Sequence, residues 1–570
     1  MSGLTISAYE RKSVLPDKWL RIIDKVVYSD WYLLAIAALV VLFWATEAMV
    51  AGFVTMLLIM SFLLVVKRDM TPCLPVLISV YCIISKGEFP PYFAYMFIIL
   101  IPVAASLIFH FVYYRNEKIK AGAFGLAYLL VAASMFMGGI MSNQLNDEIK
   151  GLAFAAFLGL LPFAVYELIV NCCNGLDKKE FVRYACRAFL YLGLLITVQL
   201  LIYYIRVWAG IIPEHAEVHL GWGISNGAAT VLLATMPIAM YVAVSEKNLF
   251  RSLLYAVIAV LQIIAVIATV SRGAILVGIM EFVLMIAASV IFNRHRKVYL
   301  LSYALVIIAI AIVCVVFKDK LIAFIERAFS NGLDGSGRDK IYEEAVNVFK
   351  QNMLFGAGFG YIGINSYLNS HPMYYFHSTF FQTIASLGMF GLVASCYMYF
   401  KRIKFAFKKA RSFNVFLIVS CFGFEGYAMI NTFTFLAVPG LLLIAVLTAV
   451  NERCNSMSDE EYSLIGAPLP LFSQNKKPID GVVFGRPEAE EKESADEAND
   501  VNEKEESAEK ESAEDVKAVE EKKTELAASE VCAEEAAADL NDEADALSSD
   551  AAIGKEKEGK KTQTDKGRRA

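Results

Sequence analysis

Long apolar segments alternate with short polar ones over the first 450 residues of this chain. A helix needs roughly 20 apolar residues to cross a bilayer, with about 17–25 as the usual range. Nine segments meet this length cleanly: 92–114, 121–141, 151–173, 187–209, 222–245, 250–270, 272–292, 298–317 and 379–400. The pattern predicts an all-α polytopic membrane protein, because helices satisfy their own backbone groups in lipid.

Three further apolar regions add to this set. Residues 31–66 are too long for one span and predict a hairpin of two spans that turns near Glu47. Residues 414–450 predict a second hairpin, broken around Asn431, and residues 71–85 predict a short span that contains two prolines. We therefore expect about 12–14 transmembrane helices.

Lys and Arg gather in every second loop. These basic loops lie at 67–68, 115–120, 178–187, 247–251, 294–297 and 402–409. Cytoplasmic loops of membrane proteins are rich in Lys and Arg. We therefore expect a multi-pass membrane protein with cytoplasmic N- and C-termini and an extracytoplasmic segment 318–378.

Segment 318–378 is the one long polar interruption of the apolar pattern, and it predicts two amphipathic helices. The first covers KDKLIAFIERAF from Lys318, and the second covers RDKIYEEAVNVFKQNM from Arg338. The second places Ile341, Ala345, Phe349 and Met353 on one face. Helices of this kind lie on a membrane surface or pack over it.

Charge divides the chain into two parts. Residues 1–450 carry 35 Lys and Arg against 24 Asp and Glu, whereas residues 451–570 carry 17 against 33. The acidic part has too few aromatic and aliphatic residues to form a core. We expect a cytoplasmic N-terminal segment at 1–30 without a cleavable signal peptide, a membrane domain at 31–450, and a disordered acidic cytoplasmic tail at 455–570. The tail is a solvated extension or a binding segment for a cytoplasmic partner.

The ten cysteines contain no CxxC spacing, and most lie inside apolar segments. They indicate neither a disulfide framework nor a metal site. We expect no metal, no cofactor and no nucleic-acid partner.

Arg272 lies in the short break between two spans, on the same side of the membrane as segment 318–378. The aliphatic part of its side chain can lie against apolar surface while the charged group reaches the membrane interface. It can also clamp a phosphate with two parallel N–H groups. Position alone leaves both interpretations open.

Segment 318–378 contains two more candidates for chemistry. Arg338 follows Gly335-Ser336-Gly337 and opens the second amphipathic helix, where free backbone N–H groups favour anions. His377 stands just before a span, either as an interfacial histidine or as a general base near its usual pKa of about 6.5. Gly356, Gly358 and Gly360 allow a sharp turn or a close backbone approach.

Several ionisable residues fall inside the apolar segments, where they are costly unless paired or hydrated. They are Glu47, His110, Glu167, Glu281 and Glu425. Spread over many spans, they are compatible with an ion or proton path, and therefore with a transporter or flippase.

Three sequence stretches together resemble the O-antigen ligase family of membrane glycosyltransferases, which includes many Wzy-type polysaccharide polymerases. They are SRGAIL at 271–276, GSGRDKIYEEAVNVFKQNMLFGAGFG at 335–360 and HSTFFQTIASLGMFG at 377–391. They occur in the family's order, and the resemblance covers about 220–400. This chain has Ser378 where the family commonly has Asn.

The resemblance implies a glycosyltransferase of the bacterial cytoplasmic membrane. It would use an undecaprenyl-diphosphate-linked glycan as donor and a glycan or lipid-glycan as acceptor, without a metal. It implies that Arg272 and Arg338 hold the diphosphate and that His377 activates the acceptor hydroxyl. The glycines would support the loop. Two alternatives remain open: a transporter or flippase, which would depend on Glu167 or Glu281, and a scaffold, which would depend on the tail.

Overall fold

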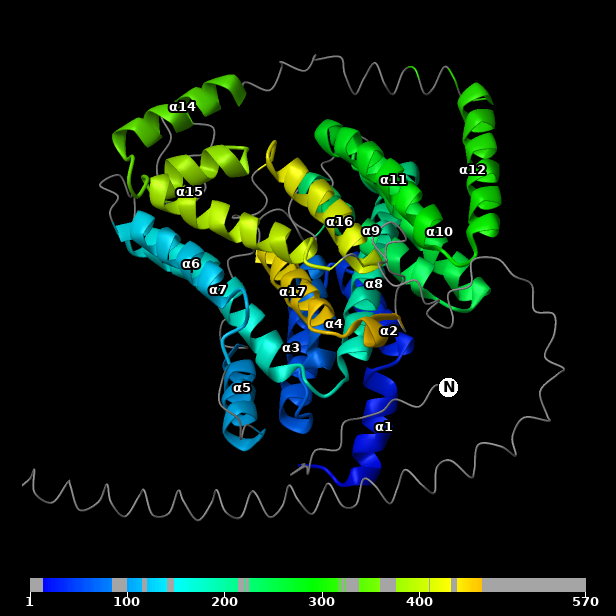
Figure 1. The fold of residues 1–570 in the computed structure, drawn as a ribbon, viewed down its shortest axis with the longest axis horizontal. Coiled ribbons are helices and arrows are strands. Elements are labelled where there is room, and N and C mark those ends of the chain that lie inside the picture. Colours follow the sequence, from blue (N-terminus) through cyan, green and yellow to red (C-terminus); the bar gives the residue numbers. More distant parts are fainter. Residues whose placement is uncertain are drawn as a thin grey trace, which may run out of the picture. The chain divides into compact units, whose positions relative to one another are not determined.

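The computed structural model describes residues 14–84, 100–114, 120–140, 148–213, 220, 225–316, 318, 322, 338–358, 376–409, 411–431 and 438–463. Its regular elements are all helical over these residues (Figure 1). Six described helices are long and apolar enough to cross a membrane. A seventh span results if α1 (Asp17–Val27) and α2 (Asp30–Ala45), which are bent by 68°, count as one.

The predicted all-α membrane architecture is confirmed. Six helices reach full length among the described residues, and the 12–14 expected refer to the whole chain. Five other apolar helices among the described residues have only 10–17 residues. Several predicted spans, such as 92–114, lie partly outside the described residues. Their full lengths therefore stay predictions.

The N-terminal part forms the predicted hairpin. α2 turns at Thr46–Ala48 into α3 (Met49–Val66), and Glu47 in this turn has a φ of 55°. The predicted span at 71–85 is instead three short helical pieces in succession. They are η1 (Thr71–Cys73), α4 (Leu74–Ser79) and η2 (Val80–Ile83). Pro72 and Pro75 stand at the starts of the first two pieces, where proline ends one helix and begins the next.

Eight helices follow along the middle of the chain. They are α5 (Leu100–Tyr114), α6 (Gly125–Ile140), α7 (Glu148–Cys172), α8 (Lys178–Trp208), α9 (Ser225–Ser245), α10 (Leu249–Ala268), α11 (Arg272–Phe292) and α12 (Arg296–Val316). α8 begins well before the predicted residue 187, because the side chain of Asp177 caps it by accepting from the backbone N–H of Glu180.

The core is built around α9. Its most apolar window is 94% buried, and α8, α10, α11 and α16 (Ser412–Ala428) all pack against it. The equivalent window of α11 is only 33% buried, with Leu276 and Val283 largely exposed. Exposed apolar side chains on a spanning helix suit a lipid-facing position. α9 therefore lies at the centre of the helix bundle, and α11 lies at its surface.

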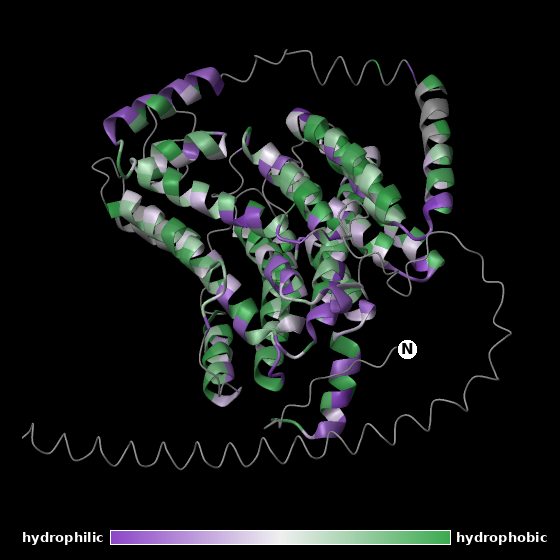
Figure 2. Cartoon of the chain, viewed as in Figure 1, coloured by the Kyte–Doolittle hydropathy of each residue, from purple (hydrophilic) through white to green (hydrophobic). Residues whose placement is uncertain are grey.

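One of the remaining described helices lies inside the polar segment 318–378, and the others follow it. They are α14 (Arg338–Gln351), α15 (Thr379–Ala406), α16, α17 (Val438–Asn455) and α18 (Asp459–Ser463). α14 is mostly hydrophilic, in contrast to the apolar surfaces of α10 and α11 (Figure 2). The first predicted amphipathic helix, from Lys318, lies outside the described residues except for residues 318 and 322.

The buried face of α14 agrees in part with the one predicted, because Ala345 is buried and Ile341 packs against the same cluster. Ala345 and Val348 are buried against Phe376, whereas Met353 is 53% exposed. Met353 lies beyond Gln351, the last residue of α14, and therefore does not belong to the helix face.

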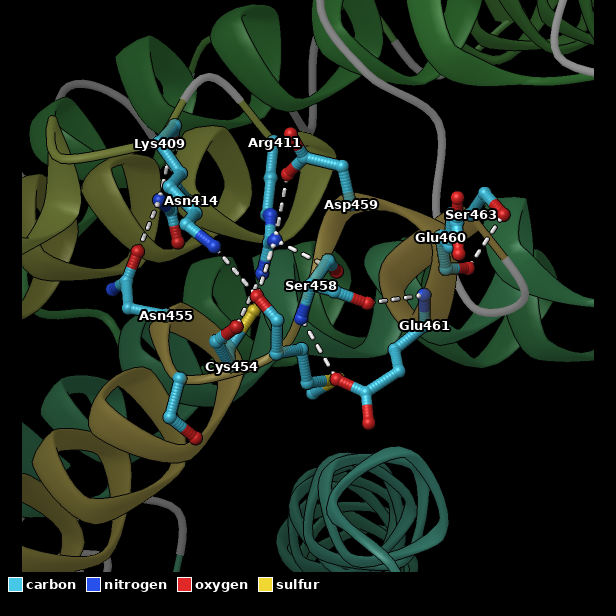
Figure 3. Close-up of polar contacts among 12 residues, drawn as sticks. Lys409, Arg411, Asn414, Cys454, Asn455, Ser458, Asp459, Glu460, Glu461 and Ser463 are labelled. Atoms are coloured by element: carbon cyan, nitrogen blue, oxygen red, sulfur yellow. Dashed lines mark hydrogen bonds and ion pairs between the residues drawn. The ribbon is translucent and has the colours of Figure 1, made fainter. Parts of the chain in front are cut away.

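Arg411 fixes the end of the described chain. Arg411 is 2% exposed, and its guanidinium group donates to the carbonyl oxygens of Met457 and Ser458 at 2.9 and 3.0 Å and pairs with Asp459 (Figure 3). The hydrogen bond from Arg411 holds the pKa of the Asp459 carboxyl below its usual range. The described chain thus continues past the boundary predicted at 455, and residues 464–570 lie outside the described set.

Candidate active site

The turn that carries Arg272 is tight and strained. Val270 has a φ of 57°, a left-handed conformation that a β-branched residue adopts only under constraint. The Thr269 hydroxyl donates to the carbonyl oxygen of Val266 at 2.6 Å, and Ser271 is buried. These contacts hold half-buried Arg272 at the first position of α11.

A chain of hydroxyl groups ties this turn to two neighbouring helices. The Tyr427 hydroxyl of α16 donates to Asn226 Oδ1 of α9 at 3.0 Å, and it lies 2.7 Å from Ser271 Oγ. Because the single Tyr427 proton goes to Asn226, the Ser271 hydroxyl is the donor to Tyr427. The starts of α9 and α11 therefore meet at the end of α16.

Arg338 reaches the same place from α14. Its Nη1 atom donates to the carbonyl oxygen of Ile430, just after α16, at 2.8 Å. A Cβ atom added to Gly273 would lie 2.5 Å from Cδ1 of the same Ile430. The two predicted phosphate-binding arginines therefore border one residue: Arg338 through its guanidinium group, and Arg272 through its neighbour Gly273.

His377 stands before α15 with a φ of 50°, another left-handed backbone. The Tyr342 hydroxyl of α14 donates to its carbonyl oxygen at 3.3 Å. Burial lowers the pKa of His377 from 6.5, and the positive charge of Arg338 lowers it further. The imidazole is therefore neutral near pH 7, as a general base must be. Ser378 caps α15 by accepting from the backbone N–H of Phe381.

The loop at 353–358, which contains Gly356 and Gly358, forms hydrogen bonds to α15 at the point where this helix is broken. Gly388 interrupts this helix with a φ of 64°. Two backbone groups on each side of the break, four in all, form hydrogen bonds outside the helix. The backbone at 353–358 satisfies all four. Ala357 and Gly358 donate to the carbonyl oxygens of Ala385 and Ser386, and Met389 and Phe390 donate to those of Met353 and Leu354, at 2.8–3.0 Å.

Gly356 and Gly358 make this contact sterically feasible. Both have a φ above 70°, and a Cβ atom at Gly356 would lie 2.3 Å from the backbone of Ser386. They therefore support the loop and fasten it to α15. Gly360, the third predicted glycine, lies outside the described residues.

Four helices begin around the residues just described: α9, α11, α14 and α15. The start of a helix carries a partial positive charge and free N–H groups. With two guanidinium groups and a neutral imidazole, the arrangement suits an anionic ligand beside a group that can accept a proton. Among the described residues, no cluster of His, Cys, Asp and Glu has the composition to hold a metal ion.

The predicted intramembrane ionisable residues are held elsewhere and apart. Glu425 pairs with Arg402, Glu167 accepts from the backbone N–H of Gly122 at 3.1 Å, and His110 contacts the carbonyl oxygen of Leu64 at 2.9 Å. Glu281 is fully buried, and its carboxylate has no hydrogen-bond partner among the described residues. Glu425, Glu167 and His110 thus have separate partners, and Glu281 lies against Gly423 of α16, the helix that carries Glu425.

Sequence reasoning missed Tyr342, Tyr427 and Asn226. Tyr342 lies four residues after Arg338, and this spacing was the signal for it, because residues i and i+4 share a helix face. Asn226 and Tyr427 carried no comparable signal, because their contacts join segments about 200 residues apart.

Residues 257–396 match the family model described as O-Antigen ligase. The matched region runs from α10 into α15 and contains Arg272, Arg338, His377 and the three glycines. No curated protein matches the chain by sequence. The resemblance in the motifs is thereby confirmed: this multi-pass membrane protein carries a domain of the O-antigen ligase family.

Proposed function

We propose that this protein is a glycosyltransferase that moves a glycan from an undecaprenyl-diphosphate carrier to an acceptor hydroxyl at the outer face of the cytoplasmic membrane. One observation carries the proposal. Arg338 acts electrostatically on His377 and also donates to Ile430, which touches the turn of Arg272. A candidate proton acceptor and the guanidinium group of Arg338 thus lie close to the turn that carries Arg272.

In the proposed reaction, His377 takes the proton of the acceptor hydroxyl. The acceptor oxygen attacks the anomeric carbon of the donor glycan and forms the new glycosidic bond. The bond between that carbon and the phosphate oxygen breaks, and its electron pair leaves with undecaprenyl diphosphate. The lowered pKa of His377 keeps the imidazole ready to accept the proton at neutral pH.

Arg272 and Arg338 would hold the diphosphate and stabilise the negative charge that grows on it as the bond breaks. Charge stabilisation of this kind is commonly the largest contribution to catalysis. Guanidinium groups suit it, because they stay charged and bind phosphate oxygens in pairs. In this mechanism the two arginines provide the charge compensation without a metal.

The distribution of Lys and Arg supports an extracytoplasmic site with both chain ends in the cytoplasm. The lipid chain of the donor would lie in the bilayer beside the spans, and α14 would cover the diphosphate. The acceptor decides the class of enzyme. A ligase would attach a finished glycan to a lipid-glycan, and a polymerase would extend a glycan by repeat units.

The test is His377→Ala in cells that otherwise lack the gene. We expect the variant to make no surface glycan product while it reaches the membrane in normal amounts. His295→Ala is the matched control, since His295 lies in the α11–α12 turn and contacts the carbonyl oxygen of Lys247. Normal product from His377→Ala would overturn the proposal.

The glycan length profile of the same cells separates the two classes of enzyme. Loss of long chains with single repeat units still attached indicates a polymerase. Loss of all attachment, with lipid-linked polymer accumulating, indicates a ligase.

The carboxylate of Glu281 has no hydrogen-bond partner among the described residues, and this favours transport as the second candidate function. A transporter would lose its activity in Glu281→Gln and tolerate the loss of Arg338. A transferase would instead lose its activity without Arg338 and tolerate Glu281→Gln.

A further inference from the structure

α14 presents two polar side chains toward the candidate site. Arg338 and Tyr342 are four residues apart and therefore share one face of the helix. Arg338 donates to the carbonyl oxygen of Ile430, and Tyr342 donates to that of His377. One rigid element thus contacts both the end of α16 and the backbone of the proposed base.

The ring of Tyr342 fixes α14 against the start of α15. It stacks on Phe381 with ring centres 4.3 Å apart and an interplanar angle of 13°. The cluster of Ala345, Val348 and Phe376 continues this contact along the helix. The Tyr342 hydroxyl is therefore held in place by packing that does not depend on its own hydrogen bond.

The backbone around His377 is held from two sides. The N–H of Phe376 donates to Gln382 Oε1 at 3.1 Å, and the carbonyl oxygen of His377 accepts from Tyr342 at 3.3 Å. Between these two contacts lies the left-handed φ of 50°. Such a conformation persists only when its surroundings hold it there.

We propose that Tyr342 is a positioning residue for the transfer reaction: its hydroxyl holds the backbone of His377 so that one helix sets both the base and Arg338. The inference rests on the proposed function, because it gives His377 the role of base. The left-handed backbone determines where the imidazole points, and a displacement of about 1 Å costs up to 100-fold in rate. Tyr342 itself makes no contact with the reacting groups.

The test compares Tyr342→Phe with wild type, using the full chain in nanodiscs and lipid-linked glycan extracted from cells that lack the gene. Phenylalanine keeps the stack on Phe381 and removes only the hydroxyl. We expect kcat to fall roughly 3- to 10-fold, as for one lost hydrogen bond. We expect KM for the lipid-linked glycan and inhibition by added undecaprenyl diphosphate to stay unchanged, since Arg338 is intact.

Tyr128→Phe is the matched control. It also loses a buried hydroxyl contact, to Thr448 Oγ1 at 3.1 Å between α6 and α17, away from the site. Wild-type kcat in Tyr342→Phe would overturn the inference. So would a fall in kcat matched by Tyr128→Phe, or one accompanied by an equal rise in KM, because either result indicates a general structural role.

The two proposals fail separately. If His377→Ala retains activity, the proposed function fails whatever Tyr342 does. If His377→Ala is inactive and Tyr342→Phe is normal, the proposed function stands and only the positioning role is lost.

Discussion

At the scale of single residues, the candidate site depends on strained backbone as much as on charge. Val270 and His377 both have left-handed φ values, of 57° and 50°. Strain of this kind costs about 1–3 kcal/mol at each residue and gathers where function needs a fixed geometry. Here it flanks the two ends of the proposed site, one beside Arg272 and one at the proposed base.

The pH dependence of activity should report on His377. Its pKa lies below 6.5, because of burial and the charge of Arg338. Only the neutral imidazole accepts a proton, so kcat/KM is expected to rise with pH through this lowered pKa. Arg338→Gln removes one of the two causes, so the pKa should rise and the acid limb should shift to higher pH.

Residual activity of each variant, measured from pH 4 to 8, checks this prediction. Arg338→Lys is the control, because it keeps the positive charge and should keep the position of the acid limb. An acid limb that stays in place in Arg338→Gln would show that Arg338 does not act on the titrating group.

At the scale of elements, the broken α15 and the loop at 353–358 form one unit. Gly388 is indispensable to it, because a Cβ atom there would lie 2.5 Å from the backbone nitrogen of Gly356 and the φ is 64°. We expect Gly388→Ala to destabilise the protein by about 2–4 kcal/mol, from the left-handed backbone and the overlap together. Thermal unfolding of the full chain in detergent measures the change.

Gly426→Ala gives the matched control. Gly426 lies inside α16, and a Cβ atom there would have nothing within 4 Å. Alanine should therefore leave stability equal or raise it by about 0.5–1 kcal/mol. Equal melting temperatures for the two variants would contradict the role assigned to Gly388.

At the scale of the whole molecule, the acidic segment is separable from the proposed chemistry. Arg411 holds the chain down to α18, and Arg272, Arg338 and His377 all lie within residues 257–396. Truncation after residue 470 is therefore expected to leave the surface glycan profile unchanged. A scaffold that acts through its tail would lose its function instead, and the same glycan profile distinguishes the two.

The sequence predicted the helical membrane class, the hairpin at 31–66, the start of α11 at Arg272 and the family domain. It could not predict that residues 71–83 form three short helical pieces, or that Val348 rather than Met353 is buried near the end of α14. In both places local geometry changes the outcome: prolines divide one apolar segment, and the end of α14 removes Met353 from its stripe.

Composition and spacing by themselves determined that this chain spans a membrane and which residues carry candidate chemistry. Both follow from local properties, namely the length of apolar segments and the chemistry of each side chain. Only the tertiary structure decided that Arg338 and Gly273, the neighbour of Arg272, border the same Ile430, and that Tyr342 contacts the backbone of His377. Such contacts join helices far apart in the sequence, and packing alone determines which helix ends meet.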